Sequence, residues 1–146
     1  MKDAAPRTIR LADYAPSAYL IDEVHLTFRL HPERTVVTSR IRFRPNPDTS
    51  DRAFELDGEN LKLNFARVDG ADVSLTIADE KLTCDVPDAP FTWEAETEIN
   101  PTANTALEGL YTSNGIYCTQ CEAEGFRKIT YYPDRPDVMA PFTVRI

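Results

Sequence analysis

Apolar and polar residues alternate along most of this chain, and this period of two constrains the fold more than any other feature. Over residues 24–30, valine, leucine and phenylalanine alternate with histidine, threonine and arginine. The pattern resumes over 37–44, after a turn at 31–34. Such alternation is typical of strands that bury one face. The two segments therefore predict a β-hairpin with a longer loop.

Shorter segments with the same period follow, over 54–56, 61–65, 73–77, 82–86 and 91–99. Turn residues separate them, notably Asp57-Gly58, Asp69-Gly70 and Asp79-Glu80. Short strands at this spacing predict an all-β, mainly antiparallel fold, either a sandwich or a curved sheet.

The C-terminal third contains more aromatic residues and fewer clean alternations. Residues 110–112 and 116–118 flank Ser113-Asn114-Gly115, which predicts a tight hairpin because Asn-Gly tolerates positive φ. The stretch from Phe126 to Tyr132 predicts a strand, residues 134–137 a helical turn, and residues 142–146 a final strand.

The composition restricts the partners and the cellular compartment that the protein can have. A chain of 146 residues suits one domain, and its net charge of −8 argues against nucleic acid and anionic membranes as partners. Three cysteines, an odd and low count, favour a reducing compartment. Neither a secretory signal nor an apolar run of the ~20 residues needed to span a membrane is present. These features predict a cytoplasmic protein, and the final apolar strand predicts that the chain is cut from a longer polypeptide.

Few residues here suit metal or nucleophilic chemistry. His25 and His31 lie six apart with opposite strand parity, so we interpret them as surface imidazoles and expect no metal site. Ser113 has no histidine in a catalytic motif. Alternating Glu94, Glu96 and Glu98 predict a solvated sheet face, and the arginines at 40, 42 and 44 are expected to pair with carboxylates across strands.

Two features of the hairpin and its exit remain open from the residues alone. Cys118 and Cys121 form a C-x-x-C, but a strand leaving a hairpin is a poor context for a redox pair, which normally sits at a helix N-terminus. Gln120 and Glu122 flank Cys121 and are expected to point to one side. An amide and a carboxylate there could hold an ammonium group and a carbonyl, or form an ordinary polar loop.

Three stretches carry a specific resemblance, and they read NPTANTALEGLY at 100–111, CTQCEAEGFR at 118–127 and ITYYPDRPDV at 129–138. Shorter matches occur in order upstream, at 19–22, 35–38 and 56–63. The chain resembles the N-terminal β-domain of bacterial aminopeptidase N, a family of zinc peptidases that carry an H-E-x-x-H motif. The resemblance spans almost the whole chain.

This resemblance implies that residues 1–146 form the first domain of an enzyme that hydrolyses N-terminal residues from peptides with one zinc. It implies a curved sheet with smaller sheets packed on it. It also assigns Gln120 and Glu122 to the pocket for the first substrate residue, with Glu122 binding the free α-ammonium. The zinc ligands and catalytic residues belong to the following domain, so we expect this chain to hold neither and to be inactive alone.

The resemblance also implies two partners, peptide substrates and the catalytic domain of the same polypeptide. We expect five side chains of the C-terminal third to pack against that domain: Phe126, Tyr131, Tyr132, Met139 and Phe142. The alternatives are a stand-alone β-sandwich binding module and, less favoured, a C-x-x-C thiol redox protein.

Overall fold

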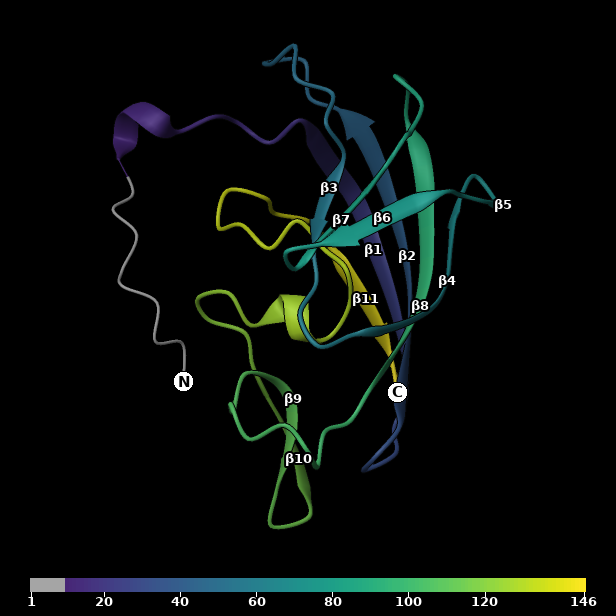
Figure 1. Cartoon of the computed structure of the whole chain (residues 1–146), viewed down its shortest axis with the longest axis vertical. Helices are drawn as coiled ribbons and strands as arrows, with labels where there is room; N and C mark the ends of the chain where they lie inside the picture. The colour runs from purple at the N-terminus through teal and green to yellow at the C-terminus, as the bar shows by residue number, and fades with distance from the viewer. Residues whose placement is uncertain (1–9) are drawn as a thin grey trace.

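The computed structural model describes residues 10–146 and contains one large sheet with two smaller ones. The large sheet has six strands in the order β11-β1-β2-β8-β4-β5. A three-stranded sheet, β3-β7-β6, crosses one face of it, and the β9–β10 hairpin lies at one end of the molecule (Figure 1). The predicted all-β, mainly antiparallel class is confirmed.

The strands and two short 3₁₀ helices have these bounds: η1 Leu11–Asp13, β1 Tyr19–Arg29, β2 Thr35–Pro45, β3 Glu55–Asp57, β4 Lys62–Val68, β5 Ala71–Asp72, β6 Leu75–Ala78, β7 Lys81–Cys84, β8 Phe91–Ile99, β9 Gly109–Ser113, β10 Ile116–Gln120, η2 Phe126–Lys128 and β11 Phe142–Arg145.

Local turn chemistry accounts for the hairpins. Both central residues have positive φ in the turns Asp69-Gly70, Asp79-Glu80 and Asn114-Gly115. Turns with two positive φ values match the right-handed twist of the flanking strands, so they close two-residue hairpins. The hairpins predicted for β1–β2 and β9–β10 are both confirmed.

The core lies between the large sheet and the smaller sheet with the C-terminal segment. An aromatic cluster fills its centre, with Phe43 and Phe54 at 5.1 Å between ring centroids and Phe54 and Trp93 at 5.6 Å. Trp93 is fully buried. Because the buried residues of β8 alternate strictly with half-buried ones, one face of this central strand is committed to the core.

Ion pairs cover the other face of the large sheet. Arg44 lies 2.8 Å from Asp22, and Arg40 lies 3.7 Å from Glu94, so the expected cross-strand pairing of these arginines is confirmed. Glu96 pairs with Arg29 at 2.9 Å. The glutamate stripe is therefore a paired surface lattice rather than a merely solvated face.

Two predicted elements of the C-terminal third are wrong. The segment from Phe126 to Tyr132 is not a strand: it begins as the 3₁₀ helix η2 and then makes a single bridge, between Tyr132 and Asp57. Residues 129–133 are all buried, so their aromatic and β-branched composition reflects burial on every side. Residues 134–137 do not form a helical turn; the chain instead makes a turn over residues 135–138, closed by Val138 N donating to Arg135 O at 3.2 Å.

The last predicted strand is confirmed. The sequence alone did not predict which strand it pairs with. β11 pairs in parallel with β1, with Phe142 opposite Val24. Of the five side chains expected to face another domain, Tyr131 and Tyr132 are instead in the core and Phe126 is half-buried. Met139 and Phe142 are exposed, at 85% and 45%.

Thr97 provides a test of how the sheet holds the C-terminal segment. Its buried hydroxyl donates to Ile129 O at 3.1 Å. We expect Thr97→Val, which keeps the shape, to lower the free energy of unfolding by about 1–3 kcal/mol because it leaves a buried carbonyl unpaired. Thr92→Val, on the outward face of the same strand, should change it by less than about 0.5 kcal/mol. Urea denaturation of both variants measures the difference, and equal effects contradict the assignment.

Candidate functional site

The loop over residues 120–125, called the Gln120–Glu122 loop after its two candidate residues, begins where β10 ends; this is the end of the β9–β10 hairpin opposite its Asn114-Gly115 turn, and the loop leads into η2 (Figure 1). Gln120 is the last residue of β10 and pairs with Gly109 of β9. Both Gln120 and Glu122 have exposed side chains. The Gln120 amide nitrogen donates to the backbone carbonyl oxygen of Glu122 at 3.4 Å, so a hydrogen bond joins the two candidate residues.

Two glycines let the loop pack tightly against the hairpin. Gly125 N donates to Cys121 O at 2.8 Å, which closes the loop. A Cβ on Gly125 would lie 2.5 Å from Gln120 O and 3.1 Å from Gly109 N. A Cβ on Gly109, whose φ is +73°, would lie 2.7 Å from Lys128 Cβ. Close approach of backbone atoms therefore helps to fix the loop.

Two consecutive basic residues anchor the loop from its C-terminal side. Arg127 binds Asp134 through both its backbone N–H and its Nε, at 3.1 and 3.0 Å, and lies 3.5 Å from Glu124 of the loop. Lys128 Nζ lies 3.2 Å from Glu59 and 2.8 Å from Glu108. Burial disfavours the charge on Lys128, yet the two hydrogen-bonded carboxylates outweigh it and raise the pKa of the ammonium.

The carboxylate of Glu122 is in a different situation. Within residues 10–146 it has no ion pair and no hydrogen bond to its side-chain oxygens. Its backbone is held, and its charge faces solvent. Such a group can accept a charge-assisted hydrogen bond from an incoming cation.

The thiols do not have the environment of a redox pair. Cys118 and Cys121 are both free, and Cys121 packs beside the second core cluster of Val37, Ile99, Leu110 and Ile129. Burial, with a smaller effect of Asp134, raises the pKa of the Cys121 thiol. Reactive thiols have lowered pKa values, so the thiol redox alternative is disfavoured.

The histidines are occupied locally. His25 Nε2 lies 3.4 Å from Glu23, and His31 Nδ1 accepts a hydrogen bond from Glu33 N at 3.2 Å. In the part of the chain that the structure describes, no group of three or more His, Cys, Asp or Glu side chains could hold a metal ion.

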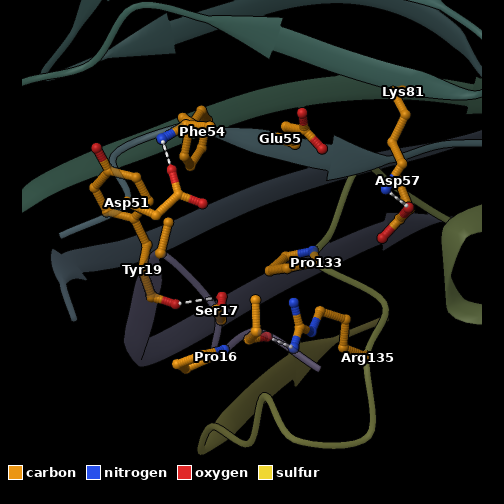
Figure 2. Close-up of a pocket in the computed structure, with 13 residues that line it drawn as sticks. Pro16, Ser17, Tyr19, Asp51, Phe54, Glu55, Asp57, Lys81, Pro133 and Arg135 are labelled. Atoms are coloured by element: carbon orange, nitrogen blue, oxygen red, sulfur yellow. Dashed lines mark hydrogen bonds and ion pairs between the residues drawn. The ribbon is translucent and has the colours of Figure 1, made fainter. Parts of the chain in front are cut away.

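A hollow of about 180 Å³ lies apart from the loop, between the segment before β1, strand β3 and Pro133 (Figure 2). Asp57 Oδ1 pairs with Lys81 Nζ at 2.7 Å there, and Arg135 donates to Ala15 O at 2.8 Å. Sequence reasoning took Asp57 only for a turn residue. Its contact with Asp134 N spans 77 positions, and no local pattern signals such a contact.

A family model described as the Peptidase M1 N-terminal domain matches residues 15–146. The chain belongs to this family. Aminopeptidase N of Caulobacter vibrioides is 44% identical over the whole chain, and that of Escherichia coli is 45% identical over 92% of it. This M1 domain spans only 17% and 15% of the lengths of these relatives.

Solved structures agree on the fold of this M1 domain. Aminopeptidase A of Legionella pneumophila, in complex with aspartic acid, superposes with a TM-score of 0.84 at 28% identity, over 93% of this chain and 17% of that one. An M1 zinc metallopeptidase of Deinococcus radiodurans gives 0.73 at 16% identity, over 87% and 32%, which supports the fold alone. Among residues 10–146, no helix is long and apolar enough to cross a membrane.

Thiol labelling tests the environments of the cysteines. Burial raises the pKa of Cys84 to about 11, from an ordinary 9.0. At pH 8 we expect Cys84 to react with iodoacetamide on the order of 100-fold more slowly than an exposed thiol, because only the thiolate reacts. Its rate should rise about tenfold per pH unit toward pH 11. Mass spectrometry of peptides measures each rate, and fast labelling of Cys121 at pH 7 would restore the redox alternative.

Proposed function

We propose that this chain is the N-terminal domain, residues 1–146, of a zinc aminopeptidase that removes N-terminal residues from peptides. Its Gln120–Glu122 loop contributes to the site for the substrate's first residue, and Glu122 accepts hydrogen bonds from the free α-ammonium. The domain takes part in binding and supplies no group that breaks the peptide bond. Alone, it is inactive.

Recognition of a free amine explains why a carboxylate belongs in such a site. An exopeptidase must distinguish an α-ammonium from the neutral amide of an internal peptide bond. A charged hydrogen bond to a carboxylate stabilises the ammonium strongly, whereas an amide cannot compensate for desolvating that carboxylate. Selectivity of this kind needs a carboxylate that is fixed in place and not already neutralised.

The observation that carries the proposal is the contrast between the held backbone and the unpaired charge of Glu122. The loop is closed by a 2.8 Å hydrogen bond and packed through Gly109 and Gly125. Gln120 stands beside Glu122 with an exposed amide. Membership of the Peptidase M1 family supports the same assignment.

The zinc of the proposed enzyme does not fit the residues of this chain that the structure describes. His25 and His31 each have a nearby carboxylate or backbone partner and do not converge. No other described cluster offers three ligands. We therefore place the metal in the remainder of the longer polypeptide and assign no step through it to this domain.

We also propose that β11 and the segment before it face that remainder. Met139, Phe142, Val144 and Ile146 are all exposed and apolar. β11 lies at the edge of the large sheet. An exposed apolar edge strand is normally covered in the native protein. A cytoplasmic location is the accompanying proposal, because all three cysteines are free thiols.

Substitution of Glu122 by Gln in the complete enzyme tests the role of the loop. The change keeps the shape and removes the charge that faces the ammonium. We expect kcat/KM on aminoacyl anilides to fall roughly 30-fold, which corresponds to about 2 kcal/mol, because one partner of a desolvated charge pair is lost. Much of the loss should appear in KM, since the ammonium is charged in both the ground and transition states.

Gln120→Ala is the matched comparison for this variant. It removes a neutral contact, so we expect a smaller loss of about 0.5–1.5 kcal/mol. Steady-state kinetics on both variants gives the two values. A Glu122→Gln enzyme within about twofold of the parent contradicts the assigned role.

Peroxide oxidation of Met139 in the complete enzyme tests the interface. This side chain is 85% exposed in the domain, so without a covering surface it should oxidise like a methionine in a short peptide. If the rest of the polypeptide packs there, we expect oxidation at least about tenfold slower, because contact excludes the oxidant. Mass spectrometry of timed samples measures the rate, and oxidation at the peptide rate argues against the interface.

A further inference from the structure

Lys128 occupies an unusual position for a lysine in an acidic domain. Its side chain is only 9% exposed, and its ammonium lies between Glu59, 12% exposed, and Glu108, 52% exposed. Lysine is rarely buried without charged partners, because desolvating an ammonium is costly. Two carboxylates at 3.2 and 2.8 Å supply that compensation.

The contacts of Lys128 join three segments that are distant in sequence. Its backbone N–H donates to Gly125 O at 3.1 Å, which ties it to the end of the Gln120–Glu122 loop. Glu108 directly precedes Gly109, the strand partner of Gln120. Glu59 lies in the connection between β3 and β4, and its own N–H donates to Arg127 O at 2.9 Å.

We propose that Lys128 is the positioning residue of the Gln120–Glu122 loop, holding both ends of the loop and the β9–β10 hairpin onto the β3–β4 connection through Glu108 and Glu59. The inference rests on the proposed function of Glu122 for its kinetic consequence. Lys128 does not contact substrate in this scheme. It determines where the carboxylate of Glu122 stands.

The first experiment measures the loop itself, by amide hydrogen exchange in the complete enzyme. In Lys128→Met we expect the Gly125 amide, now bonded to Cys121 O at 2.8 Å, to exchange at least about tenfold faster, while amides of β2 are unchanged. Glu108→Gln, at a half-exposed position, should give a smaller increase and guards against a folding defect in the first variant. Lys62→Met is the matched control, because Lys62 pairs with Glu98 on the opposite face of the sheet.

The second experiment is a kinetic double-mutant cycle with Glu122→Gln. We expect Lys128→Met alone to raise KM about tenfold with kcat changed less than about threefold, since small misplacements of a binding group can cost up to about 100-fold. In the Glu122→Gln background the same substitution should change KM less than about twofold, because the group it positions is already disabled. Lys62→Met should leave KM unchanged in both backgrounds.

The outcomes separate the two proposals. Unchanged hydrogen exchange at the Gly125 amide in both Lys128→Met and Glu108→Gln overturns the positioning role. The role is also overturned if the double variant changes KM by the product of the fold-changes of Lys128→Met and Glu122→Gln. Faster exchange with parental kinetics for Glu122→Gln overturns the function proposed for Glu122 and leaves the hold of Lys128 on the loop established.

Discussion

The rest of this structure depends on residues 129–133, a buried segment that lies between the large sheet and the three-stranded sheet β3-β7-β6. A chain segment that is buried on all sides must satisfy its polar groups internally. Thr97 and Ser39 of the large sheet bond Ile129 O and the Thr130 hydroxyl, at 3.1 and 3.3 Å. On the other side, Tyr132 exchanges two backbone hydrogen bonds with Asp57, at 2.8 and 3.1 Å. These bonds hold the segment in one position relative to both sheets. They thereby also fix where η2, which directly precedes the segment, and the loop before η2 lie.

A chain of charged groups connects the buried segment to the loop at the surface. Asp57 is 6% exposed and accepts from Asp134 N at 3.0 Å while pairing with Lys81 at 2.7 Å. Asp134 in turn binds Arg127 of η2, the short helix that follows the loop. Hydrogen-bonded ion pairs at the edge of a core tolerate little displacement, because each partner would otherwise be left desolvated. These ion pairs and hydrogen bonds link the sheet β3-β7-β6 to the Gln120–Glu122 loop, although no strand of that sheet pairs with the loop.

Sequence reasoning succeeded where the signal is local. Alternation fixed the faces of β1, β2 and β8, and the turn residues located the hairpins. It failed for 126–132 because a period of two cannot be distinguished from burial on every side in a short apolar run. The same ambiguity made the buried Tyr131 and Tyr132 look like surface contacts. The parallel pairing of β11 with β1 joins Phe142 to Val24, and no local pattern encodes a contact of that range. Gln120 and Glu122 gained their assignment from family resemblance, not from the residues themselves.

The distribution of charge around the loop explains how one carboxylate can stay available in a region that also contains two cations. Arg127 and Lys128 follow Glu122 closely in sequence, but among the described residues neither is paired with it. Each is instead engaged by other acids, Arg127 by Asp134 and Glu124 and Lys128 by Glu59 and Glu108. The cations thereby immobilise the backbone and leave the charge of Glu122 uncompensated. The carboxylate of Glu122 therefore stands on a held backbone with no cation of the described residues paired to it, as the ammonium-binding role proposed for it requires.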